Sequence, residues 1–160
     1  MTTLVALIGL PGAGKTELAR AIAAETKWPI VDRDSFPRAS FDDAGKAQAT
    51  DAAFTVARET LLQGTSCILD GMTLSSSQQR SRVRGIAREC AAQAILVWLD
   101  CAVDVAIARV AAQADHPARD RSAALVREVA VRFEQPERDV LRLDALRATS
   151  ELLGKLLPRL

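Results

Sequence analysis

One eight-residue stretch constrains the fold of this chain more than any other. Residues 9–16 read Gly-Leu-Pro-Gly-Ala-Gly-Lys-Thr and match the phosphate-binding loop pattern G-x-x-x-x-G-K-[S/T] at every fixed position. The residues before it, 4–8, are apolar and partly β-branched, as in a buried parallel strand. The residues after it, 17–25, are rich in helix formers. A strand, this loop and a helix in succession predict a site for a nucleoside triphosphate.

Each residue type in this loop has a physical role. The glycines can take backbone angles closed to other residues and let main-chain N–H groups approach a ligand. Those N–H groups and the N-terminus of the following helix attract a polyphosphate. Lys15 can reach the β- and γ-phosphates, and the Thr16 hydroxyl can ligate Mg²⁺. The predicted nucleotide contacts in this stretch are Gly9, Pro11, Gly12, Ala13, Gly14, Lys15, Thr16 and Glu17.

Composition limits the class of protein. The 160 residues are 49% hydrophobic and 26% charged, which is typical of one globular domain, here residues 1–160. A net charge of +1 and 4% aromatic residues argue against a nucleic-acid surface. Three cysteines without a close pair, and one histidine, predict neither a disulfide framework nor a zinc site. Without a signal peptide or membrane-spanning run, we expect a cytoplasmic monomer or homodimer that does not contact membranes.

Apolar runs and helical patterns alternate along the chain. Strands alternating with helices predict right-handed crossovers and a three-layer α/β/α fold around a five-stranded parallel sheet. The polar, helix-poor segment at about 113–122 is expected to form a small lid. The predicted strands are 4–8, 28–32, 66–70, 94–100 and 140–144, and the predicted helices are 17–25, 42–62, 76–92, 103–112, 122–134 and 149–157.

Two of these helices carry informative side chains. In the helix at 42–62, Ala47, Phe54, Ala57 and Leu61 share one apolar face, and we expect Phe54 to pack in the core, the alternative being that it shapes the acceptor pocket. The helix at 76–92 carries arginines at positions 80, 82, 84 and 88 with few acids nearby. We interpret these arginines as a solvated face, the alternative being a site for an anionic substrate.

Several short motifs follow the loop in a meaningful order. They are residues 32–36, which follow the second strand; 68–71, which end the third; and 98–100, 108–109 and 132–136. With them, the whole chain resembles the small P-loop kinases, which include shikimate, gluconate, adenylylsulfate and nucleoside-monophosphate kinases. It is most similar to the AAA_33-like ATP-binding kinases, near chloramphenicol phosphotransferase and the zeta-type toxins. The resemblance implies the P-loop NTPase fold with a lid.

Asp32 and Asp34 follow the second predicted strand, at the sheet edge where such folds bind ligands. A kinase that acts on an alcohol needs a carboxylate to orient the hydroxyl and accept its proton. Resemblance to chloramphenicol phosphotransferase and zeta-type toxins gives this role to Asp34. In shikimate-kinase-like members, the first aspartate of such a pair supports the metal. The alternative is that Asp34 and Ser35 only cap the next turn.

Asp70 ends the third predicted strand in the Walker B pattern, apolar residues followed by aspartate. A carboxylate there can hold Mg²⁺ through the water shell of the ion. The alternatives are that Asp70 caps the turn at Gly71, or that Asp32 supports the metal instead. Gly71 and Arg38 are expected to contact the substrate together with Asp34.

Three further residues are implicated by the resemblance. Arg109 resembles the lid-base arginine of nucleoside-monophosphate kinases, which stacks on adenine, although it could also be an exposed helix residue. Arg119 and Arg121 lie in the predicted lid, where an arginine would stabilise charge on the transferred phosphoryl group. Nucleoside-monophosphate kinases carry a second arginine where this chain has Gln113, which leaves open which of the two acts.

These inferences predict an ATP-dependent phosphotransferase with a small-molecule hydroxyl as acceptor. Lys15 and the loop hold the phosphates, Thr16 with Asp70 or Asp32 holds Mg²⁺, and Asp34 positions the acceptor. One alternative is a nucleotide-dependent ATPase or switch protein without an acceptor. Another is a polynucleotide 5′-hydroxyl kinase, against which the charge and the few aromatics argue.

Overall fold

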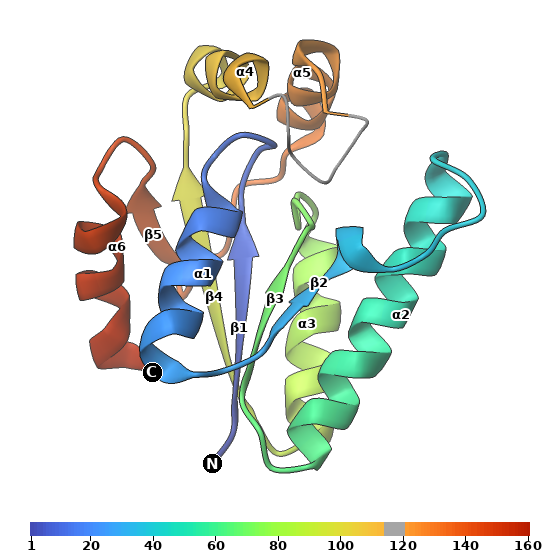
Figure 1. Ribbon diagram of the computed structural model, residues 1–160, viewed down its shortest axis with the longest axis vertical. Helices are drawn as coiled ribbons and strands as arrows, with labels where there is room; N and C mark the ends of the chain where they lie inside the picture. The colour runs from blue at the N-terminus through green and yellow to red at the C-terminus, as the bar shows by residue number, and fades with distance from the viewer. Residues whose placement is uncertain (114–120) are drawn as a thin grey trace.

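A five-stranded parallel sheet with helices on both faces forms the centre of the molecule (Figure 1). The computed structural model describes residues 1–113 and 121–160. The sheet order is β2-β3-β1-β4-β5, and each neighbouring pair is parallel. This arrangement confirms the predicted fold class. The strands are β1 (Thr3–Ile8), β2 (Ile30–Asp32), β3 (Cys67–Asp70), β4 (Gln93–Asp100) and β5 (Leu141–Asp144).

The helices follow the predicted segments with small shifts at their ends. They are α1 (Lys15–Thr26), α2 (Asp43–Leu62), α3 (Ser77–Glu89), α4 (Val103–Ala112), α5 (Ala123–Arg132) and α6 (Thr149–Leu156), with 3₁₀ turns η1 (Arg33–Ser35) and η2 (Leu157–Arg159). α5 ends before the predicted residue because Phe133 has extended backbone and stacks its ring 6.1 Å from that of Trp98. Among the described residues, each helix is too short or too polar to cross a membrane.

The central strand β1 explains why the sheet has two covered faces. Val5 and Leu7 pack into a core with α1, α4, α5 and α6. Leu4, Ala6 and Ile8 point the other way and pack with α2 and α3. Side chains alternate along a strand, so only a continuous apolar run can serve both cores. The run at 4–8 therefore specified a central parallel strand.

One end of the sheet gathers the loops that matter for function. In Figure 1, α4 and α5 lie beyond the tips of the strand arrows, at the carboxyl ends of the strands. The loops after β1, β2 and β3 meet at the same end. The two chain termini lie toward the opposite end. In open parallel sheets, ligands bind outside the carboxyl ends of the strands.

Two expectations about helix faces are wrong. Arg80 is fully buried rather than solvated: its Nη2 contacts the Glu137 carboxylate at 3.0 Å, and its Nη1 donates to the Leu74 carbonyl at 2.9 Å. The acid that pairs with it comes from 57 residues away, so the local sequence did not show the partner. Ala47 is exposed on the cleft side of α2, whereas Phe54 is buried as expected.

Candidate active site

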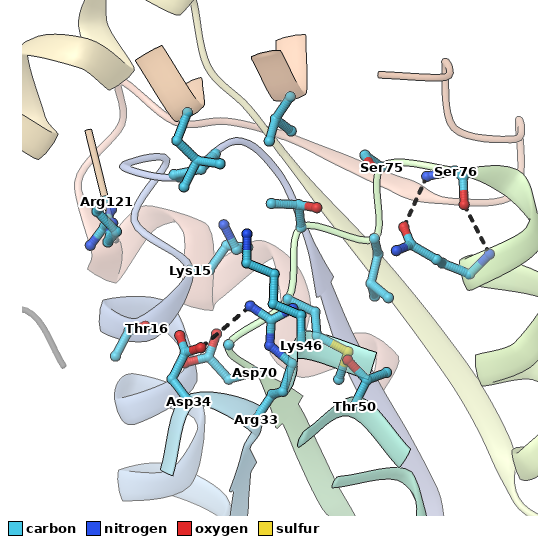
Figure 2. Close-up of a pocket in the computed structure, with 18 of the residues that line it drawn as sticks. Lys15, Thr16, Arg33, Asp34, Lys46, Thr50, Asp70, Ser75, Ser76 and Arg121 are labelled. Carbon is cyan, nitrogen blue, oxygen red and sulfur yellow. Dashed lines mark hydrogen bonds and ion pairs between the residues drawn. The ribbon is translucent and has the colours of Figure 1, made fainter. Parts of the chain in front are cut away.

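A cleft of about 1430 Å³ opens at the carboxyl edge of the sheet. The phosphate-binding loop and α5 form one side of it, and α2 with the N-terminus of α3 forms the other (Figure 2). Pockets for single small ligands usually measure roughly 300–1,000 Å³. The cleft therefore has room for a triphosphate end and a second molecule beside it.

The phosphate-binding loop joins β1 to α1 and has the shape that its glycines permit. Gly12 and Gly14 have φ of +86° and +99°, in the left-handed region that favours glycine. A Cβ on Gly12 would lie 2.5 Å from the Ala106 carbonyl oxygen, so glycine also lets α4 pack directly on the loop. The predicted nucleotide contacts that line the cleft are Pro11, Gly12, Gly14, Lys15, Thr16 and Glu17.

Lys15 is the charged centre of this wall. Its Nζ donates to the carbonyls of Gly9 at 2.9 Å and Leu10 at 2.8 Å. Burial lowers the pKa of the Lys15 ammonium to about 8, and the nearby Asp70 carboxylate opposes that shift. A buried cation with few water contacts gains strongly from an anionic ligand. The loop therefore offers a desolvated positive charge to a phosphate.

Three predicted nucleotide contacts stand behind the cleft rather than on its surface. Gly9 donates its N–H to the Thr73 carbonyl at 3.1 Å, and Ala13 is buried. Arg109 donates to the Ala13 carbonyl at 3.2 Å and to the Ala145 carbonyl at 2.8 Å. These bonds use the edge of the guanidinium. Stacking on adenine would use its flat face, so the predicted stacking is compatible with them.

Asp32 and Asp70 are cross-strand neighbours at the ends of β2 and β3, but their carboxylates serve different purposes. Asp32 Oδ1 accepts the Asp34 N–H at 2.9 Å and so caps η1. Burial raises the pKa of Asp32, and the charges of Asp70 and Asp34 add to that effect. The Asp32 carboxylate thus holds the turn.

Asp70 faces the cleft instead. Its side chain is 2% exposed, and its buried Oδ1 has no hydrogen-bond partner within the described part of the chain. Thr16 lines the same cleft. A buried carboxylate oxygen without a partner is costly unless a ligand satisfies it. A hard oxygen ligand beside a threonine hydroxyl suits Mg²⁺, so the residues present fit this ion.

Asp34 lines the same cleft from η1 and lies close to Thr16 and Asp70 in Figure 2. Its Oδ1 contacts Arg33 Nη2 and Arg38 Nη2, both at 3.3 Å. Both ion pairs use Oδ1, so neither competes with a ligand at Oδ2. The Asp34 side chain does not cap the turn, because Asp32 has that role. Arg38 stands behind Asp34, 5.0 Å from the centre of the Phe41 ring, and Gly71 lines the cleft.

Several cleft residues were not predicted from sequence. Arg33 lines the cleft beside Asp34, and Asp51 of α2 contacts Arg82 of α3 at 2.6 Å. The Arg82 guanidinium also lies 4.3 Å from the centre of the Phe54 ring. The cleft side of α2 could have been recognised from the sequence, because its residues recur at intervals of three and four, which places them on one face of a helix. They are Asp43, Lys46, Ala47, Thr50, Asp51 and Phe54.

The N-terminus of α3 closes the far side of the cleft. Ser76 Oγ accepts the Gln79 N–H at 3.2 Å and Gln79 Oε1 accepts the Ser76 N–H at 3.1 Å, a capping box (Figure 2). Glu134, just after α5, accepts the Ser77 N–H at 3.0 Å. This bond and the buried Arg80 pair tie the segment after α5 to this wall.

The predicted lid is only partly within the described residues. Arg121 lines the cleft, and its Nη1 donates to Gln113 Oε1 at 3.0 Å. Its charge is near enough to Lys15 to contribute to the lowered pKa of that ammonium. Arg119 and the rest of 114–120 lie outside the described residues, so the assignment of a lid arginine stays a prediction.

Comparison with known proteins gives a family match and several relatives. The family model described as AAA domain, AAA_33, matches residues 4–136. A shikimate kinase of Bradyrhizobium diazoefficiens is 32% identical over 124 residues, which cover 71% of this chain and 56% of the relative. A shikimate kinase of Rhodopseudomonas palustris is 29% identical over 140 residues, which cover 81% and 66%. The chain thus spans less than two thirds of the length of either relative.

Solved structures give the same fold. The APS kinase CysC of Mycobacterium tuberculosis, in complex with AMPPNP and APS, superposes with a TM-score of 0.75. The match covers 98% of this chain and 96% of that one at 18% sequence identity. Identity this low supports the likeness of fold alone. The arrangement of sheet, loop and flanking helices is therefore that of a small P-loop kinase.

Proposed function

This chain belongs to the AAA_33 family of AAA domains, and from that premise we propose that it is an ATP-dependent phosphotransferase acting on a hydroxyl of a small molecule. One observation carries the proposal. One continuous cleft is lined both by the phosphate-binding Lys15 and by the carboxylate of Asp34, whose charge is close enough to act on the pKa of Lys15. A protein that only binds a nucleotide needs the lysine, whereas a carboxylate beside it suits an acceptor hydroxyl.

The phosphate side acts through charge and backbone donors. The loop N–H groups and the N-terminus of α1 hold the triphosphate, and Lys15 contacts its β- and γ-phosphates. The lowered pKa of Lys15 supports this role, because an anion compensates a buried cation for its lost water. Thr16 and Asp70 are the residues that would hold Mg²⁺. When bound, the ion neutralises charge on the β- and γ-phosphate oxygens.

The acceptor side acts through Asp34. The acceptor hydroxyl donates its hydrogen bond to Oδ2, while Arg33 and Arg38 hold Oδ1. Oxygen of this hydroxyl attacks the γ-phosphorus as the bond to the β–γ bridging oxygen breaks. The hydroxyl proton passes to Asp34, and the products are ADP and a phosphate ester. Arg38 is in this proposal a support for Asp34, which refines its expected contact with substrate.

An acceptor screen tests this function. ATP turnover is measured with and without hydroxy acids, sugars, nucleosides, aminoglycosides and a 5′-hydroxyl oligonucleotide, with transfer of labelled γ-phosphate as the readout. We expect at least one small-molecule class to become labelled and to raise turnover well above the acceptor-free rate. Labelling of the oligonucleotide alone would identify a polynucleotide kinase. Turnover that no acceptor changes would favour an ATPase or switch protein.

A further inference from the structure

Arg33 occupies a place in the cleft that the sequence did not suggest. It is the first residue of η1, directly after β2, and it lines the cleft between Asp34 and the residues of α2 (Figure 2). Its carbonyl accepts the Phe36 N–H at 3.1 Å, and the capping bond from Asp34 to Asp32 closes the same turn. The backbone that carries Arg33 is therefore fixed on both sides.

The guanidinium of Arg33 does not use all of its N–H donors within the described part of the protein. Its Nη2 contacts Asp34 Oδ1 at 3.3 Å, which is long for a charged pair. Its Nε is buried and has no hydrogen-bond partner within residues 1–113 and 121–160. Buried N–H donors are nearly always partnered, so an exception beside a cleft calls for a functional explanation. The side chain is 20% exposed and lines the cleft, where a ligand can reach it.

Arg38 also has a buried nitrogen, Nη1, without a partner among the described residues, but it does not line the cleft, and two other arginines near the cleft are more fully engaged. Arg82 pairs with Asp51 and lies on the Phe54 ring. Arg109 donates to two backbone carbonyls behind the loop. Arg33 is also close enough to Lys15 for the two positive charges to repel each other, which contributes to the lowered pKa of the lysine. An anion that binds between Lys15 and Arg33 would offset the repulsion between their positive charges.

We propose that Arg33 is a catalytic residue whose guanidinium contacts the γ-phosphoryl oxygens during transfer from ATP to the acceptor. The inference rests on the proposed function. Lys15 holds these oxygens from the side of the loop, and Arg33 meets them from the side of the acceptor. The planar fork of arginine matches two phosphoryl oxygens, and it remains protonated throughout. A positive charge aimed at the transferred group stabilises the charge spread over it in the transition state.

The test uses a transition-state analogue and needs no knowledge of the acceptor. Dissociation constants of Mg-ADP and of Mg-ADP with aluminium fluoride are measured for the wild type, Arg33→Lys and Arg33→Gln. In Arg33→Gln we expect binding of the analogue to weaken about 10²–10³-fold, the usual effect of removing one transition-state contact. Mg-ADP alone should bind almost as in the wild type, and Arg33→Lys should fall between. Arg88→Gln removes an exposed arginine of α3 and serves as the matched control.

The same measurements separate a catalytic role from a structural one. If Arg33 only held Asp34 in place, adding Arg33→Gln to Asp34→Asn would weaken analogue binding no further, and the proposal would be overturned. Equal losses for Mg-ADP and the analogue would also overturn it, because they indicate uniform binding rather than a transition-state contact. A wild type that binds no Mg-ADP would instead overturn the proposed function itself. Thermal unfolding of each variant shows that the fold is retained.

Discussion

The two walls of the cleft are built in opposite ways. The part of the phosphate wall that meets the nucleotide comes from one short stretch, Pro11, Gly12 and residues 14–17, and its shape follows from glycines and a helix start. The acceptor wall is assembled from η1, the loop after β3, α2 and α3, which are separated along the chain. A local motif keeps its chemistry wherever its strand and helix form. An assembled wall can change its specificity without disturbing that motif, which is how one fold serves many substrates.

The walls also differ in electrostatics. The phosphate wall presents a half-buried lysine whose pKa is lowered to about 8 by the loss of water around its ammonium. The acceptor wall presents carboxylates and guanidiniums that are already paired, Asp34 with Arg33 and Asp51 with Arg82. One wall is prepared for a strong anion, and the other for a polar molecule of mixed character. Apart from Arg33, which we propose contacts the transferred phosphoryl group, substitutions should therefore affect nucleotide and acceptor separately.

The largest effect is expected at the phosphate wall. Lys15→Ala should lower ATP turnover by about 10²–10³-fold or more, because it removes the cation that contacts the transferred phosphate. Its ammonium contacts the loop carbonyls rather than an apolar core, so the fold should persist. Turnover and circular dichroism are compared with Lys155→Ala, an exposed lysine of α6. Normal ATP turnover in a folded Lys15→Ala protein would contradict the assignment of residues 9–16 as the phosphate-binding loop, and with it the contrast between the two walls.

The next effect should be confined to the acceptor wall. Asp34→Asn is expected to lower transfer to the acceptor about 10²-fold, near the lower limit for a positioned base, because the loose transition state needs less proton transfer. ATP affinity should not change. Transfer and ATP binding are measured side by side, with Asp104→Asn on α4 as control. Loss of ATP affinity in Asp34→Asn would mean that the two walls are not independent.

A smaller effect should distinguish Asp32 from Asp70, which are cross-strand neighbours at the ends of β2 and β3. Asp70→Asn should raise the Mg²⁺ concentration for half-maximal nucleotide binding about 10-fold, in the range found for residues that support a metal's ligands. Asp32→Asn should change it less, because the Asp32 carboxylate is used by the Asp34 N–H. To test this, nucleotide binding to both variants is measured as a function of Mg²⁺ concentration. A larger effect in Asp32→Asn would give the metal role to Asp32.

The smallest effect concerns the proton on Lys15. With a pKa of about 8, the free protein has mostly neutral Lys15 at pH 9, and a bound polyphosphate raises that pKa. ADP binding at pH 9 should take up roughly 0.5–1 proton, and at pH 6.5 almost none from this group. Calorimetry in buffers of different ionisation enthalpy measures the uptake. In Lys15→Arg, whose side chain does not titrate in this range, the uptake at pH 9 should disappear.

Much of the fold could be predicted because it depends on local patterns. The apolar run at 4–8 alternates into two cores, as a central parallel strand requires. The end of α5 was misplaced because Phe133 leaves the helix to pack on Trp98, a contact between distant segments. Arg80 was misread for the same reason, since its acid lies 57 residues away.

By itself, the sequence determined the phosphate wall, because glycines, lysine and threonine act there through their own backbone and nearest neighbours. Only the tertiary structure decided which of Asp32 and Asp70 is used within the fold. Both end a strand and look equivalent in sequence, yet the Asp32 carboxylate is used by a turn, whereas Asp70 near Lys15 keeps a buried Oδ1 without a hydrogen-bond partner among residues 1–113 and 121–160. It also decided that Arg33 faces the cleft. Such choices depend on which groups remain unpaired after packing, and a local pattern does not contain that information.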